Sequence, residues 1–74
     1  MSVARVIEIS STSDRSFEDA IQEGIARASK TLRQVTSAWI KEQEVEVTNG
    51  AITRYKVHML VTFILEDTMG VGET

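Results

Sequence analysis

Three glutamates, Glu42, Glu44 and Glu46, occupy alternate positions near the middle of the chain. Alternate positions of a β-strand share one face, so their carboxylates would lie in a row. Clustered carboxylate oxygens are the ligands that calcium and magnesium prefer, which makes this row a candidate site for a divalent cation. The alternative is a charged row that faces solvent, as charged side chains usually do.

A basic row follows at Arg54, Lys56 and His58. Lys56 could contact the anionic group of a phosphorylated ligand, or it could pair with Glu42 across two neighbouring strands. His58 is the single histidine, and the chain has no cysteine. A zinc site made of cysteine and histidine ligands is therefore excluded.

Trp39 is the only tryptophan. It is a candidate platform on which a planar ligand could stack, and the alternative is an aromatic side chain that fills the core. The sequence contains no nucleophile elbow and no glycine-rich phosphate loop, and His58 has no nucleophile arranged beside it. We therefore expect a binding protein and not an enzyme.

Hydrophobic periodicity predicts the elements that would position these residues. Strands are expected at Val3–Ile9, Ala38–Thr48 and Ile52–Leu65, and a polar loop at Ser10–Arg15. Between the first two strands, an apolar repeat every three or four residues predicts a helix of about twenty residues that runs through Val35.

The sequence predicts where the helix starts and shows that one of its faces is made of small residues. Ser16 is the expected N-cap, with Asp19 three residues later in the capping-box position. Ala20, Gly24 and Ala28 fall on the apolar stripe, and such small residues predict a close approach to a sheet.

The turn Thr48-Asn49-Gly50 decides which side chains share a face in the hairpin. A two-residue loop would put the glutamates on the face of Tyr55 and Val57. A three-residue loop reverses this, and we expect the longer loop, with a bulge further along the hairpin left open as an alternative that would change the face of Trp39. It would pair Glu44 with Arg54 and Glu42 with Lys56, and the side chains on the core face would then be Trp39, Val45 and Val47.

The order strand, helix, strand, strand predicts an α+β fold. It would be a three-stranded antiparallel sheet with the last strand central, wrapped around one helix. That last strand would be about 46 Å long at its usual rise, whereas a compact chain of this length is only about 30 Å across. The strand must curl or project into a neighbour, so we expect a homo-oligomer.

The rest of the composition narrows the function classes. The net charge of −3 argues against a nucleic-acid partner, which usually requires a basic stripe. No apolar run approaches 18 residues, and no signal peptide is visible, so we expect a cytoplasmic protein without membrane association. Residues 68–74, with two glycines and no pattern, are expected to form a flexible tail.

The chain resembles the dodecins over Val3–Asp67. The resemblance rests on four segments in order: RVIEI before a short Ser/Thr loop, the helix AIQEGIARASKTLRQV, the hairpin EQEVEV-turn-ITRYKV, and VTFILED. It implies a dodecin-like domain at residues 1–67 that assembles as a hollow homododecamer of trimers. It also implies storage or buffering of flavins, riboflavin or FMN, in place of catalysis.

The flavin positions of the family are altered. The stacking tryptophan of flavin-binding members falls on Ser37, and Trp39 comes two residues later. The glutamine that holds the flavin edge falls on Lys56, which can donate hydrogen bonds but cannot accept them. The pattern is closer to a subgroup that lacks the tryptophan and is linked with cation binding.

Two hypotheses follow from this resemblance. In the first, the shell binds flavin or another planar or phosphorylated ligand in a pocket lined by Ser37, Trp39, Gln43 and Lys56. In the second, it is a flavin-free structural shell or a divalent-cation-binding shell, in which Lys56 and the glutamates are mutual partners.

Overall fold

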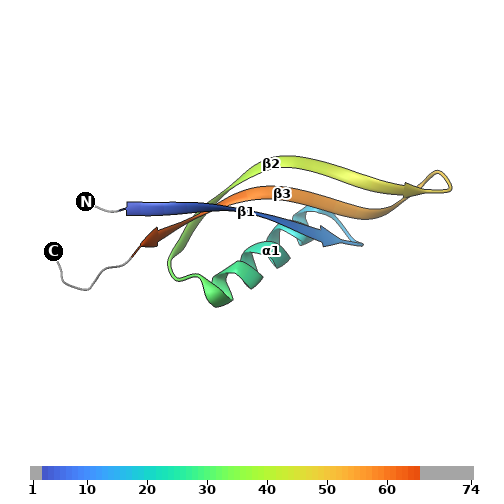
Figure 1. Ribbon diagram of the computed structural model, residues 1–74. Helices are drawn as coiled ribbons and strands as arrows, with labels where there is room; N and C mark the ends of the chain where they lie inside the picture. Colours follow the sequence, from blue (N-terminus) through green and yellow to red (C-terminus); the bar gives the residue numbers. More distant parts are fainter. Residues whose placement is uncertain (1–2, 66–74) are drawn as a thin grey trace.

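The computed structural model describes residues 3–65. It consists of β1 (Val3–Ser13), α1 (Phe17–Thr31), β2 (Val35–Thr48) and β3 (Ala51–Leu65) (Figure 1). The sheet order is β1-β3-β2, and both neighbours are antiparallel to β3. The expected β-α-β-β fold with a central last strand is confirmed, whereas the expected tail at residues 68–74 lies outside the described residues.

Two element boundaries differ from the prediction. The segment Ser10–Ser13 was expected in a loop, but it continues β1 and pairs with β3 as far as Tyr55. The helix ends four residues earlier than expected, at Thr31. The reason is that Val35 belongs to β2, where it pairs with Phe63 and packs against the core. The chain turns between the two elements at Gln34, whose φ is 57°.

The start of α1 and its face of small residues agree with the prediction. The Ser16 Oγ accepts a hydrogen bond from the Asp19 backbone N–H at 2.9 Å, which satisfies one of the free donors at the helix N-terminus. Gly24 is buried against the sheet. A Cβ placed on it would lie 2.5 Å from the Cε of Met59 and 3.0 Å from the Cβ of Ser11.

The core lies between α1 and one face of the sheet. Ala20 of the helix packs against Val57, Met59 and Val61, which occupy alternate positions of β3 and are fully buried. Because β3 is the central strand, its side chains on this face are covered from both sides by its neighbours and by α1. Within residues 3–65, no helix lies over the opposite face of the sheet (Figure 1).

The hairpin between β2 and β3 closes with a two-residue turn, so the predicted three-residue turn was wrong. Thr48 pairs with Ala51, and the two residues between them both have positive φ, 52° at Asn49 and 79° at Gly50. Asn-Gly favours this conformation because asparagine and glycine tolerate the left-handed region.

A bulge beyond the turn brings the glutamates opposite the basic residues, on the same face of the sheet, as predicted. The register shifts between Glu46 and Val47, which leaves Thr53 of β3 without a partner. The glutamates therefore do share a face with the basic row, as predicted. Each glutamate, however, lies opposite a basic residue two positions further along β3 than the predicted partner. Glu46 lies opposite Arg54, and Glu44 lies opposite Lys56.

A second bulge lies in β2 at Lys41, since Ile40 pairs with Met59 but Glu42 pairs with His58. The extra residue reverses the alternation, so Ile40 faces the core and Trp39 faces away from it. The prediction that Trp39 lies on the core face was therefore wrong, and its side chain is 68% exposed. Val45 is half-buried as predicted, whereas Val47 is 60% exposed near the hairpin tip.

The molecule is elongated, with principal extents of 57 × 19 × 13 Å. Its radius of gyration is 15.7 Å, against about 11 Å for a compact chain of this length. The β2–β3 hairpin continues well past α1 and the end of β1 (Figure 1). The structure thus confirms that the last strand overhangs its own domain.

Candidate functional site

We call the sheet surface that α1 does not cover the open face. Its side chains are those that alternate with the core positions of each strand. They are, by strand, Val6, Glu8, Ser10 and Thr12 of β1, Arg54, Lys56, His58, Leu60 and Thr62 of β3, and Ser37, Trp39, Glu42, Glu44 and Glu46 of β2.

Trp39 forms the largest exposed apolar surface on the open face. It lies directly opposite Leu60 on β3, and Leu60 lies directly opposite Glu8 on β1. These three residues therefore form one row across the sheet, about 10 Å from end to end at the usual strand spacing. Ser37 is on the same face, one pair further along, opposite Thr62.

An ion pair crosses the open face beside Trp39. The Lys41 Nζ lies 3.3 Å from the Glu8 Oε2, so the lysine side chain spans β3 to reach β1. The bulge permits this because Lys41 has no partner in the register of β2 and β3. Both side chains are about half exposed, 46% for Lys41 and 50% for Glu8.

The charged rows occupy the part of the open face nearer the hairpin. Glu44 Oε1 lies 3.2 Å from His58 Nε2, and Glu46 Oε1 lies 3.9 Å from Arg54 Nε. Within residues 3–65, Lys56 and Glu42 form no ion pair. The predicted pairs of Glu44 with Arg54 and of Glu42 with Lys56 are therefore wrong, because the shorter turn and the bulge at Thr53 each shift the register by one residue.

The predicted ligand-binding residues do not converge within one subunit. Ser37 and Trp39 are neighbours on the open face, and Lys56 shares this face about 13 Å further along β3. Gln43 is on the other face of the sheet, because it pairs with the buried Val57. One chain therefore offers Ser37 and Trp39 together, with Lys56 at a distance and Gln43 apart.

No metal centre is assembled in the described part of the chain. Residues 3–65 contain no group of three or more histidine, aspartate or glutamate side chains placed to hold an ion. Glu42, Glu44 and Glu46 lie in a row as predicted, but two of the three are already paired with His58 and Arg54.

Sequence reasoning missed Glu8 and Lys41 as members of the surface around Trp39. One signal was available in β2, where the apolar positions are even-numbered at Ala38 and Ile40 but odd-numbered at Val45 and Val47. Such a change of parity requires an extra residue in the strand between them. The crossing of Lys41 to Glu8 depends on the pairing of all three strands, which no local pattern contains.

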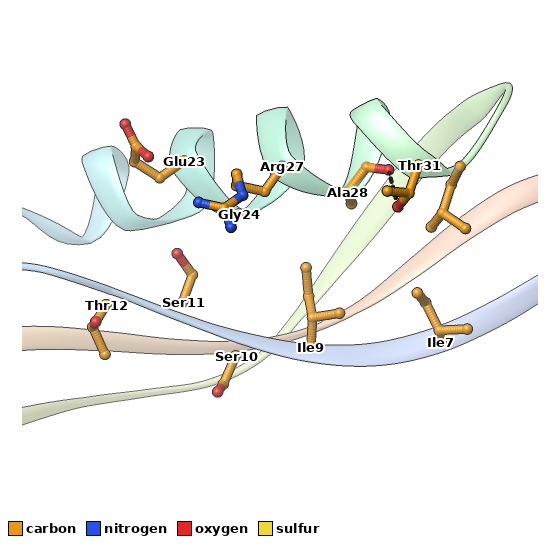
Figure 2. A pocket seen from close by; sticks show the side chains of 11 residues that line it. Ile7, Ile9, Ser10, Ser11, Thr12, Glu23, Gly24, Arg27, Ala28 and Thr31 are labelled. Atoms are coloured by element: carbon orange, nitrogen blue, oxygen red, sulfur yellow. Dashed lines mark hydrogen bonds between the residues drawn. The ribbon is translucent and has the colours of Figure 1, made fainter.

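A concave surface lies on the other side of the sheet, between β1 and α1. It is an open groove of about 500 Å³. Figure 2 shows Ile7 and Ile9 of β1 on one wall and Ala28 and Thr31 of α1 on the other, with Arg27 near Gly24. None of the predicted site residues lines this groove.

Comparison with known proteins identifies the fold family. The dodecin family model matches residues 3–66. The chain belongs to the dodecin family. It is 36% identical over 66 residues to the dodecin of Thermus thermophilus, covering 89% of this chain and 96% of that protein. It is 33% identical over 63 residues to the calcium dodecin of Mycobacterium tuberculosis, covering 85% and 89% of the two chains.

Solved dodecin structures agree with this fold. The dodecin of Streptomyces davaonensis matches with a TM-score of 0.85 and 33% identity over 89% of this chain and 97% of its own. The M. tuberculosis calcium dodecin, whose structure is described as having a novel calcium-binding site, matches with a TM-score of 0.76 and 30% identity. That match covers 93% of this chain and 99% of the other. No helix within residues 3–65 is both long and apolar enough to cross a membrane.

Proposed function

We propose that this dodecin is a non-enzymatic shell that binds a planar ligand of the flavin class, riboflavin or FMN, on the open face of its sheet. Twelve copies would form the hollow shell, arranged as trimers. The overhanging hairpin and the uncovered face support this assembly, because both leave apolar surface that a single chain cannot bury. A cytoplasmic location is part of the proposal.

The observation that carries the ligand class is the position of Trp39. A tryptophan that is 68% exposed on a sheet, beside the half-buried Leu60, offers a flat apolar surface in the open. Aromatic rings stack on such a surface in offset geometry. Trp39 takes the stacking role that Ser37 cannot perform, and Ser37 supplies a hydroxyl beside it.

Lys56 and Gln43 have secondary places in this proposal. Lys56 has no carboxylate partner in the described part of its own subunit. Its ammonium is therefore free to meet the phosphate of FMN or a group from a neighbouring subunit. Gln43 lies on the other face of the sheet, so a contact with the same ligand would have to come through another copy of the chain.

Fluorescence titration tests the proposal. Riboflavin emission should be quenched by the native protein with saturation at micromolar concentration, and Trp39→Ala should abolish the quenching. Val6→Ala is the matched control, because it removes an exposed apolar side chain from the same face. Undiminished quenching by Trp39→Ala would show that the flavin binds elsewhere, and no quenching by the native protein would exclude a flavin site.

A divalent-cation shell is the second candidate. The similarity to a calcium dodecin and the row of Glu42, Glu44 and Glu46 favour it. Glu42, which has no ion-pair partner in the described part of its subunit, would be the first ligand, with carboxylates of neighbouring copies completing the site. Calorimetric titration with calcium should then give heat that Glu42→Gln removes and Glu18→Gln, on the helix, does not.

A further inference from the structure

The surface beside Trp39 carries a hydrogen-bond donor and an acceptor side by side. The Lys41 ammonium donates only, and the Glu8 carboxylate accepts only. They lie 3.3 Å apart at the end of the row that runs from Trp39 over Leu60 to Glu8. A planar ligand that contacts Trp39 and covers Leu60 therefore brings its far edge to this ion pair.

We propose that Glu8 and Lys41 together recognise an imide edge of the ligand, in which a ring N–H lies between two carbonyl groups. Lys41 would donate to one carbonyl oxygen, and Glu8 would accept from the ring N–H. This inference rests on the proposed function and deepens it, because it names which planar heterocycles bind. Ligands with an imide edge, such as the isoalloxazine ring of a flavin, would be preferred over rings that lack it.

Three features of the pair favour this role. Both side chains are about half exposed, so their own attraction is weak and a ligand can reach them. Hydrogen bonds with one ionised partner are stronger than those between neutral groups, so each group gains from a ligand contact. The bulge holds Lys41 out of the strand register, and the ammonium can therefore cross the sheet at the level of the row.

The same chemistry is missing at Lys56. That residue also donates only, and the nearest carboxylate on the facing strand, Glu44, is in contact with His58. Within residues 3–65 the Lys56 ammonium forms no ion pair, so a ligand there would find a donor with no acceptor held against it. The Glu8–Lys41 pair supplies both functions near Trp39, so the imide is assigned there and not at Lys56.

The test uses two ligands that differ only in the group carried by the imide nitrogen. Riboflavin carries the imide N–H, and 3-methylriboflavin carries a methyl group in its place. The native assembly should bind the methylated compound about tenfold more weakly, since it loses a hydrogen bond to a charged acceptor. Glu8→Leu should bind riboflavin with the same loss and should no longer distinguish the two compounds. Lys41→Met should also weaken riboflavin binding.

Matched controls make the same charge changes on the helix, on the other side of the sheet. Glu23→Leu and Lys30→Met should leave both affinities and the distinction between the ligands unchanged. Size-exclusion profiles of all variants should coincide, which separates a lost contact from a lost fold.

The outcomes separate this inference from the proposed function. If Trp39→Ala abolishes binding while the native protein binds both compounds equally, the flavin site stands and the imide contact is overturned. If Glu8→Leu binds weakly but still prefers riboflavin, Glu8 has only a structural role, and the inference is again overturned. If native protein binds neither compound, both the flavin site and the imide contact are excluded.

Discussion

Trp39 and Leu60 lie directly opposite each other on β2 and β3, on the face of the sheet that α1 leaves open. This relationship depends on a single extra residue, Lys41, because the alternation of β2 reverses there. If Lys41 instead paired regularly between Ile40 and Glu42, Trp39 would face the helix and Ile40 would face outward. The way in which this one residue is accommodated therefore determines the face on which Trp39 lies.

The first prediction concerns that bulge. Deletion of Lys41 should let Ile40 and Glu42 alternate regularly, so that Ile40 stays against the core and Trp39 stays on the open face. The free energy of unfolding should therefore stay within about 1 kcal/mol of that of Lys41→Ala, which keeps the residue count and loses the same exposed ion pair. Chemical denaturation followed by circular dichroism would compare the two variants. A deletion variant less stable than Lys41→Ala by about 3 kcal/mol or more would contradict this account of the bulge, because it would mean that Ile40 had left the core.

The second prediction concerns the contact of the helix with the sheet. Gly24→Val should lower the free energy of unfolding by about 1–3 kcal/mol, because its side chain would overlap Met59 and Ser11. Denaturation curves would show it as a lower midpoint. Ala26→Val is the comparison, because Ala26 is exposed on the same helix. If the two variants were equally stable, Gly24 would not be in close contact with the sheet.

The third prediction concerns the start of α1. Ser16→Ala removes the acceptor for the Asp19 backbone N–H and should cost about 1 kcal/mol. Ser29→Ala, at an exposed position inside the helix, should be neutral or slightly stabilising because alanine has the higher helix propensity. A thermal scan of the two variants would check the difference, and identical melting temperatures would argue against the cap.

The fourth prediction concerns the turn. Gly50 has φ +79°, with nothing within 4 Å of a Cβ placed there. Gly50→Ala should therefore destabilise the protein through backbone strain alone, by about 1–2 kcal/mol. The control Thr53→Ala changes the unpaired residue of the neighbouring bulge and removes only a hydrogen bond to the Glu46 carbonyl. A stable Gly50→Ala variant would mean that the turn has another conformation in solution.

The elements marked by a local pattern of apolar or capping residues could be predicted from the sequence. The alternation Tyr55, Val57, Met59, Val61 identified the core strand, and the Ser16 and Asp19 pattern located the helix start. The antiparallel order with β3 central also followed from the order of the elements. These features are determined by side chains close to one another along the chain.

The exposed site could not be predicted in the same way. The face on which Trp39 lies depends on the length of the turn and on two bulges between the turn and Trp39. Each extra or missing residue exchanges the two faces for all residues beyond it, so one wrong turn length puts a whole strand on the wrong face. Here the turn was predicted one residue too long, and the bulge at Thr53 offset the error for the glutamates. The bulge at Lys41 had no such compensation, and Trp39 was therefore assigned to the wrong face.

Native mass spectrometry of the purified protein with excess riboflavin tests the central claim most directly, because one spectrum reports both assembly and ligand. The account predicts a species of twelve chains carrying bound riboflavin, and the same species without riboflavin for Trp39→Ala. A monomer or dimer as the main species, or a twelve-chain species that never carries riboflavin, would contradict the proposed flavin-binding shell.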